Sequence, residues 1–287
     1  MKRRGSLGKR SAFDTVSNVL IILFCLLSIF PLYWMVTGSF KYSGDVVKLP
    51  PDWFPIHPTL YNYRGVFTNH PAWRWIVNSV SVTLITTAGI VLVSSAAGYA
   101  LSKMRFIGRR LIFSFVIAAL LVPMEVYVLP LYKQVTSYGW RGSVTGAYLA
   151  MIVPNLAMPF GVYLMKNFYD TIPDALVEAA TLDGCGRTRF FFEIGIPLSK
   201  GGIGALAILA GIRIWNNYLW QLLNTFSSKY LYTLPVGVAG LFDTSSGETD
   251  YGLRMAAATV SALPLFIIFF SFQRFFTSGI TAGAVKE

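Results

Sequence analysis

The chain has little charge: only 13% of its 287 residues are Asp, Glu, Lys or Arg, whereas 54% are hydrophobic. Soluble domains carry about a quarter charged residues, so this composition is too apolar for one water-soluble core and indicates an integral membrane protein. The formal net charge is +11, but the basic residues flank hydrophobic runs and form no separate basic domain. This placement excludes a nucleic-acid-binding protein and is typical of the positive-inside bias of membrane proteins.

Cysteine and histidine are also scarce, with two of each. Cys25 lies in an apolar run and Cys185 in a polar one, so no disulfide is expected, and His57 and His70 lack the spacing of metal ligands. The phosphate-binding loop G-x-x-x-x-G-K-[ST] is missing, and no catalytic carboxylate pair, nucleophile elbow or zinc motif stands out. The sequence therefore predicts a chain without metal, cofactor or catalytic residues of its own.

What the chain has in abundance is long apolar runs. Six of them reach the roughly 20 residues that a bilayer crossing needs, which predicts an all-α polytopic membrane protein with six transmembrane helices in one domain over residues 1–287. The first run is too long for a signal peptide and has no small-x-small cleavage site, so it should be retained. The predicted spans lie near Val16–Ser39, Trp75–Met104, Leu111–Leu131, Val144–Met165, Gly202–Leu223 and Arg254–Phe272.

Lys and Arg are unevenly distributed between the two sides of these spans. With the N-terminus inside, the inner segments hold 15 of the 24 basic residues, the outer segments hold 8, and Arg213 lies within a span. The positive-inside rule then places both termini in the cytoplasm. The polar segment 170–197, between the fourth and fifth spans, falls on the same side.

The 170–197 segment combines helix formers with turn residues. It contains Glu178-Ala179-Ala180-Thr181-Leu182-Asp183-Gly184 and, further on, Ile194-Gly195-Ile196-Pro197. Thr171 is expected to cap a first short helix, with Asp174 near its positive end. Gly184 can turn the chain by adopting a positive φ, and a second short helix is predicted over Thr188–Glu193. The segment should therefore form two short helices at an angle.

This pattern resembles the cytoplasmic EAA…G…I.LP loop of the membrane subunits of binding-protein-dependent ABC importers. Cys185 stands where that family often has Ala. Together with further matches, the resemblance covers nearly the whole chain and is strongest to the smaller, maltose-type permease subunit of carbohydrate-uptake importers. The further matches are Val122-Pro123, Leu129-Pro130-Leu131-Tyr132, Trp215-Asn216-Asn217-Tyr218 and the C-terminal Gly283-Ala284-Val285-Lys286.

The resemblance implies that the 170–197 segment is a coupling helix pair on which an ATPase docks. It implies a sugar or oligosaccharide as solute, a second homologous permease, an extracytoplasmic solute-binding protein, and two ATPase subunits that would hold ATP and Mg. It also implies a multi-pass protein in the lipid of a bacterial or archaeal plasma membrane. The implied coupling residues are Glu178, Ala179, Ala180, Asp183, Gly184, Ile196 and Pro197.

Two ionisable residues, Glu125 and Arg213, fall inside predicted spans, where a charge is costly and usually faces a bundle interior or a wet cavity. Because both lie at comparable depth at about 1.5 Å per residue, they either pair and orient helices or contact the solute. A polar and aromatic set suits a sugar, although interhelical hydrogen bonding is the alternative. This set is Asn155, Trp215, Asn216, Asn217 and Tyr218.

Other functions stay open at this point. Arg213 would suit a sugar-related anionic solute such as glycerol phosphate. A stand-alone secondary carrier is disfavoured, because inverted repeats are not visible and the 170–197 segment would be unexplained. A membrane anchor without transport activity is disfavoured by kinked spans that carry charges.

Overall fold

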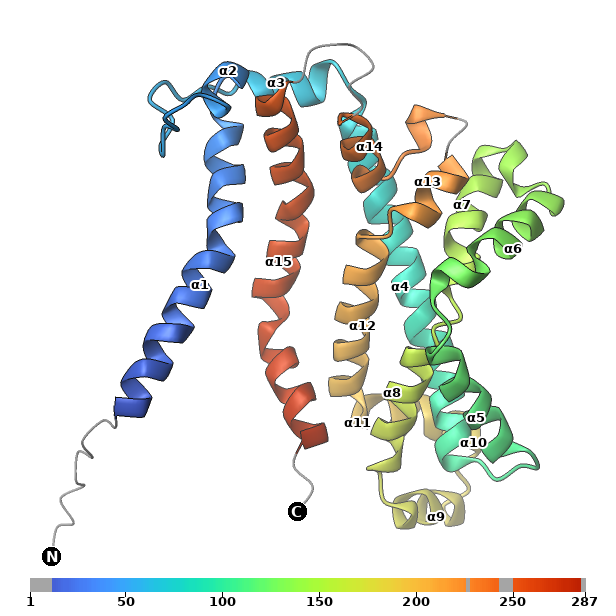
Figure 1. Ribbon diagram of the computed structural model, residues 1–287. Coiled ribbons are helices and arrows are strands. Elements are labelled where there is room, and N and C mark those ends of the chain that lie inside the picture. The colour runs from blue at the N-terminus through green and yellow to red at the C-terminus, as the bar shows by residue number, and fades with distance from the viewer. Residues whose placement is uncertain (1–11, 226–227, 243–249, 285–287) are drawn as a thin grey trace, which may run out of the picture. The chain divides into compact units, whose positions relative to one another are not determined.

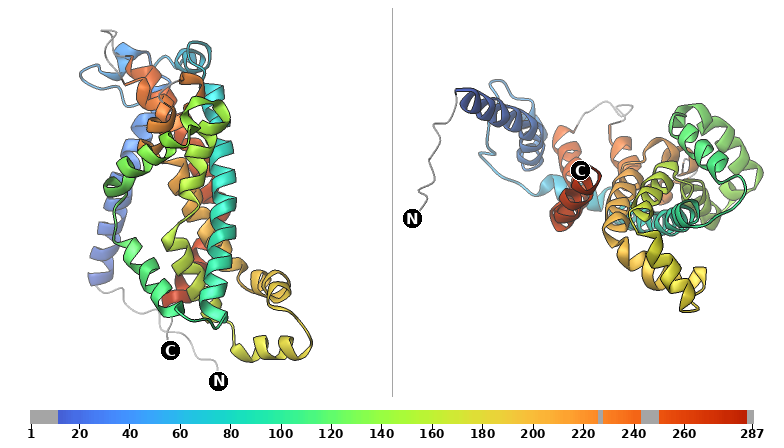
Figure 2. Two further views of the ribbon diagram at one scale, coloured as in Figure 1. Left: turned by 90° about the vertical axis from the view of Figure 1, so that its right-hand side faces the viewer. Right: turned by 90° about the horizontal axis from the view of Figure 1, so that it is seen from below.

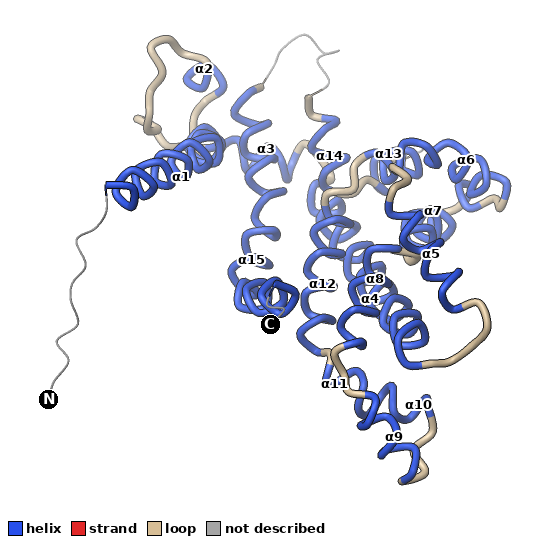
Figure 3. The backbone as a smooth tube through the Cα atoms, turned by 60° about the horizontal axis from the view of Figure 1, so that its bottom comes forward, coloured by secondary structure: helices blue, strands red, loops and turns tan. Residues whose placement is uncertain are grey.

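The computed structural model describes residues 12–225, 228–242 and 250–284, and these ranges contain helices and loops but no strand (Figures 1 and 3). The chain divides into two compact units. The first unit comprises residues 1–70 and 242–260, and the second comprises residues 71–241 and 261–287. The single domain predicted over residues 1–287 stays a prediction.

The first unit contains α1 (Ala12–Ser39), α2 (Ser43–Val46), α3 (Tyr61–Thr68) and the beginning of α15 (Tyr251–Ala284). The buried Asn62 amide ties these elements together, because its Nδ2 donates to the carbonyl oxygens of Ser39 at 2.8 Å and Lys41 at 2.7 Å. Gly252 allows this approach: a Cβ there would lie 2.7 Å from the Asn62 amide. A buried side-chain amide with two hydrogen bonds thus holds these segments together.

The α1 helix is apolar around its whole circumference. Large side chains such as Phe24 (72% exposed) and Leu27 (69% exposed) are not covered by the rest of the chain. An amphipathic helix of a soluble protein would bury one face, whereas this helix exposes apolar groups all round. The pattern is that of a membrane-spanning helix.

The core of the second unit is built by α4 (Ala72–Lys103), α8 (Pro159–Asp170) and α12 (Lys200–Trp215), and α4 packs most extensively against the other two. Glycine permits the close crossing of α4 and α8, since a Cβ on Gly98 would lie 2.7 Å from the backbone nitrogen of Lys166. Small residues at a helix crossing let backbones approach in this way.

Three further candidate spans consist of pairs of bent helices. The bend is 103° between α5 (Arg109–Leu120) and α6 (Met124–Ser137), 48° between Val144–Asn155 and α8, and 77° between Arg187–Leu198 and α12. The α1, α4 and α15 helices are long and apolar enough to cross a membrane unbroken, and counting each bent pair as one span gives six.

The remaining helices are short. The stretch Val144–Asn155 consists of α7 (Val144–Ile152) and the 3₁₀ turn η2 (Val153–Asn155). The others are α9 (Asp174–Leu182), α10 (Arg187–Phe190), the π-helical η3 (Phe191–Gly195), α11 (Ile196–Leu198), α13 (Leu219–Thr225), α14 (Leu234–Gly240), and the 3₁₀ turns η1 (Trp140–Gly142) and η4 (Lys229–Leu231).

The structure differs from the predicted spans in three places. The run Val144–Met165 bends by 48° between Asn155 and the start of α8 at Pro159. The run Leu111–Leu131 is not one helix: α5 ends at Leu120, and Pro123, which has no N–H to donate, precedes α6 in a new direction. The run Gly202–Leu223 is interrupted after Trp215, where α12 ends. Asn216 and Asn217 follow, and their side chains compete with helical backbone hydrogen bonds.

Candidate functional site

The 170–197 segment extends from one end of the α4, α8 and α12 bundle of the second unit, as the yellow helices in Figure 2 show. Its α9 helix begins at Asp174, directly after Pro173. Thr171 does not cap this helix as predicted, because it ends α8, where its hydroxyl donates to the carbonyl oxygen of Phe168 at 2.7 Å. Because the N-terminal end of a helix carries a partial positive charge, the negative charge of Asp174 in the first turn stabilises α9.

The end of α9 is a Schellman turn. The N–H of Cys185 donates to the carbonyl oxygen of Ala180 at 2.8 Å, and the N–H of Gly184 donates to that of Thr181 at 3.0 Å. This turn requires a left-handed residue, and Gly184 has φ +76°. A Cβ at Gly184 would meet nothing within 4 Å, so glycine is needed for its backbone conformation alone. The predicted turn at Gly184 is confirmed.

Aromatic rings pack the second half of the 170–197 segment against the bundle. Phe190 and Phe191 are buried against Tyr99 of α4, and the ring centroids of Tyr99 and Phe191 are 5.2 Å apart. Tyr169 of α8 meets Tyr99 edge to face at 5.6 Å, and the Tyr99 hydroxyl donates to the carbonyl oxygen of Arg187 at 3.3 Å. These close-packed rings join the segment to the same core as α4 and α8.

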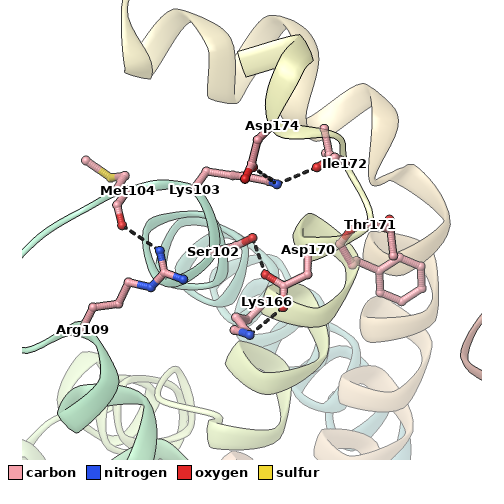
Figure 4. A network of polar contacts seen from close by, with 10 residues as sticks. Ser102, Lys103, Met104, Arg109, Lys166, Asp170, Thr171, Ile172 and Asp174 are labelled. Carbon is pink, nitrogen blue, oxygen red and sulfur yellow. Dashed lines mark hydrogen bonds and ion pairs between the residues drawn. The ribbon is translucent and has the colours of Figure 1, made fainter. Parts of the chain in front are cut away.

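Polar contacts fasten the first half, as Figure 4 shows. The Nζ of Lys103, at the end of α4, donates to Asp174 Oδ1 at 2.7 Å and to the carbonyl oxygen of Ile172. Its side chain is only 6% exposed. Nearby, the Ser102 hydroxyl donates to Asp170 Oδ1 at 2.7 Å. The hydrogen bond from Lys103 lowers the pKa of the Asp174 carboxyl below its ordinary value, since the ammonium stabilises the charged form.

Much of α9 is exposed, including the face that carries Asp174. Glu178, Ala179 and Asp183 all lie on the surface of the chain. Glu178 makes no salt bridge or side-chain hydrogen bond with any other residue that the structure describes. It lines a cavity of about 640 Å³ between α9 and the end of α4. The exposed surface of α9 and its C-terminal turn therefore offers two carboxylates to a second protein.

The other predicted coupling residues face the bundle or the bend. Ala180 is buried in the core that contains Phe190 and Phe191, and Ile196 packs against the same core. Pro197 is exposed, and with Ile196 it lines an apolar groove of about 580 Å³ along α12. The predicted coupling residues thus fall into two groups. Ala180 and Ile196 pack against the core, and the others are exposed.

The predicted solute residues are only partly brought together. Asn216, Asn217 and Tyr218 form the break between α12 and α13. Trp215 is buried beside this break, and its Nε1 donates to the carbonyl oxygen of Ser261 at 3.2 Å. Asn155 donates to the carbonyl oxygen of Met151 at 2.8 Å within its own turn. Trp215 and Asn155 therefore have structural partners already.

Glu125 and Arg213 are both exposed, on α6 and α12. They form no ion pair with each other among the described residues. An unpaired charge in an apolar span is costly, so each should meet water, solute or another subunit.

A buried amide pair on α13 was not predicted from the sequence. Gln221 is completely buried, and both its amide atoms lack a hydrogen-bond partner in the described chain; the same holds for Asn224 Oδ1. Buried amides without partners are unfavourable. These two amides follow the break at Asn216, and their burial can be expected only once the end of α12 is known.

The comparisons with known proteins agree on one family. The model described as "Binding-protein-dependent transport system inner membrane component" matches residues 89–282. The arabinooligosaccharides transport system permease protein AraQ of Bacillus subtilis is 33% identical over 279 residues, covering 96% of this chain and 97% of the relative. The diacetylchitobiose uptake system permease protein NgcG of Streptomyces coelicolor is 29% identical, covering 96% and 89%.

Two further similarities extend this picture. The sn-glycerol-3-phosphate transport system permease protein UgpE of Yersinia pestis is 31% identical, covering 94% of this chain and 97% of the relative. A crystal structure of a bacterial ABC transporter involved in the import of the acidic polysaccharide alginate has a chain that matches with a TM-score of 0.80 at 20% identity, covering 93% and 97%. At this low identity, the match to the solved structure shows only that the two chains share a fold.

Proposed function

The chain belongs to the family of inner-membrane components of binding-protein-dependent transport systems, and from this premise we propose that it is one permease subunit of an ATP-driven importer of a sugar or oligosaccharide. As a member of the family it is a membrane protein and a transport component. The binding protein would deliver the solute from outside, and a second permease would complete the pathway.

The observation that carries the proposal is the two-sided 170–197 segment. Its α9 helix and the following turn expose Glu178, Ala179 and Asp183, whereas Phe190 and Phe191 of its second half pack against Tyr99. A partner that moves the exposed surface would therefore displace α4 and α8 with it. Since the sequence has no phosphate-binding loop, ATP and Mg would be held by separate ATPase subunits, and their closure would open the pathway to the outside.

The nature of the solute is supported by the named relatives. Two of them transport arabinooligosaccharides and diacetylchitobiose, which favours a carbohydrate. A sugar-related anion is the second candidate, favoured by the relative named for sn-glycerol 3-phosphate and by Arg213, an exposed cation within α12. The two solutes differ in charge, so competition of uptake by glycerol 3-phosphate or by neutral oligosaccharides distinguishes them.

The proposed orientation places both termini in the cytoplasm. It is supported by the excess of Lys and Arg on that side, 15 against 8. The 170–197 segment would then face the ATPases.

Copurification followed by uptake tests the proposed function. A tagged chain, extracted in mild detergent, is expected to bring down a second permease and an ATPase, which mass spectrometry identifies. Proteoliposomes of this complex should accumulate sugar only with ATP and the binding protein. A chain recovered alone that transports sugar without ATP would be a secondary carrier, and the proposal would be wrong.

A further inference from the structure

The cavity of about 640 Å³ beside α9 has a basic lining. It is formed by the end of α4, the turn before α5, α9 and the start of α10, all within the second unit. Four basic and two acidic residues line it, which leaves a net charge of +2. These residues are Lys103, Arg105, Arg109, Arg187, Asp174 and Glu178.

Much of the hydrogen-bonding capacity of these cations is unused. Lys103 is engaged by Asp174, and one nitrogen of Arg109 donates to the carbonyl oxygen of Met104 at 3.2 Å (Figure 4). The side chains of Arg105 and Arg187 make no hydrogen bond or salt bridge with the described residues. Because a guanidinium has five N–H donors in a planar fork, a concave group of three suits the oxygens of a phosphate.

The turn that carries two of these arginines has an apolar tip. Ile107 is fully exposed and Phe106 is 42% exposed, and Gly108 turns the chain with φ +86°. Arg105 precedes this tip, and Arg109 begins α5, which buries none of its residues. Apolar and aromatic groups between cations at the start of an apolar helix are typical of the membrane interface. We therefore expect the cavity to lie at the level of the lipid headgroups.

We propose that this cavity binds a phosphate group, and that the group belongs to the headgroup of an anionic phospholipid whose acyl chains lie along α5. The headgroup bridges the turn before α5, through Arg105 and Arg109, to the start of α10, through Arg187. It thereby ties the 170–197 segment to the bilayer surface. This site goes beyond the proposed function, because it requires neither solute nor ATP.

Native mass spectrometry of the purified, delipidated protein, together with any subunits that copurify, tests this site. Phosphatidylglycerol should bind saturably, and phosphatidylcholine should bind more weakly because its headgroup has no net charge. Arg105→Gln and Arg187→Gln should each weaken phosphatidylglycerol binding by about fivefold. Arg110→Gln is the matched control: Arg110 is exposed at the start of α5 but does not line the cavity, and its replacement should leave binding unchanged.

A second arm, with inorganic phosphate as the probe, distinguishes the source of the group. Phosphate binding with the same dependence on Arg105 and Arg187, and no arginine-dependent lipid binding, would keep the phosphate site but overturn the lipid. Equal losses in Arg110→Gln, or none in Arg105→Gln and Arg187→Gln, would overturn the site itself. Melting temperatures check that each variant is folded, and Arg187→Lys, which retains the charge without the fork, provides a milder variant.

Discussion

Lys103 links the end of α4 to the beginning of α9 through two acceptors, Asp174 and the carbonyl of Ile172. Its side chain is only 6% exposed, although the Asp174 side chain that it contacts is 77% exposed. Lys103→Met should lower the stability of the folded chain by about 1–3 kcal/mol, because the Ile172 carbonyl loses its donor. Thermal unfolding in detergent measures the loss. Lys103→Arg retains a donor and should lose less; an equal loss in both variants would contradict the role of the hydrogen bonds.

Asp174 makes this link sensitive to acid. Its folded pKa is lowered by Lys103, so the stabilisation is present above the ordinary carboxyl pKa and is lost as the pH falls through the lowered folded value. Wild type should therefore melt above Asp174→Asn at neutral pH, and the difference should disappear in strong acid. A difference that is unchanged across this range would show that the charge of Asp174 contributes nothing.

Glu178 is the exposed carboxylate on which docking of an ATPase should depend most. Glu178→Lys reverses a charge that makes no salt bridge or side-chain hydrogen bond within the described chain, so folding should be unaffected while uptake falls and ATP hydrolysis continues. Parallel assays of uptake and hydrolysis in proteoliposomes separate the two effects. Thr188→Lys, also exposed on the 170–197 segment, is the control. Uptake equal to wild type in Glu178→Lys would remove this residue from the coupling role.

At the scale of elements, the turn after α9 determines the direction in which the 170–197 segment returns to the bundle. Gly184→Val should strain this turn by about 1–2 kcal/mol, because a β-branched residue disfavours the left-handed conformation. Gly184→Asn should be tolerated, since asparagine adopts this conformation more readily. The ratio of uptake to ATP hydrolysis should fall in the valine variant only. Equal ratios in both variants would show that the turn is not required for coupling.

The crossing of α4 and α8 is the second element that a single residue controls. Gly98→Leu would place side-chain atoms against the backbone of Lys166 and should destabilise the bundle by about 1–3 kcal/mol or more. Gly201→Ala on α12, where a Cβ meets nothing within 4 Å, is the matched control and should be neutral. Unfolding temperature and detergent-extracted yield measure both, and a wild-type yield of Gly98→Leu would contradict the close crossing.

For the whole molecule, sequence periodicity was sufficient for some features and insufficient for others. Apolar length predicted the membrane helices, and the chemistry of glycine predicted the turn at Gly184. The sequence did not reveal the link between Lys103 and Asp174, because it joins residues 71 positions apart whose charges have no local pattern. It also missed the burial of Gln221, which depends on where α12 ends. Local propensity determines elements, whereas such contacts exist only after packing.

We propose that an ATPase docks on the exposed surface of the 170–197 segment. Cysteine cross-linking tests it without knowledge of the solute. Ala179→Cys, in a chain with Cys25→Ser and Cys185→Ala, should cross-link to the copurified ATPase. Thr68→Cys, exposed on α3 and predicted to lie outside the cell, should not. A cross-link from Thr68→Cys, or none from Ala179→Cys in an intact complex, would contradict both the docking face and the proposed orientation.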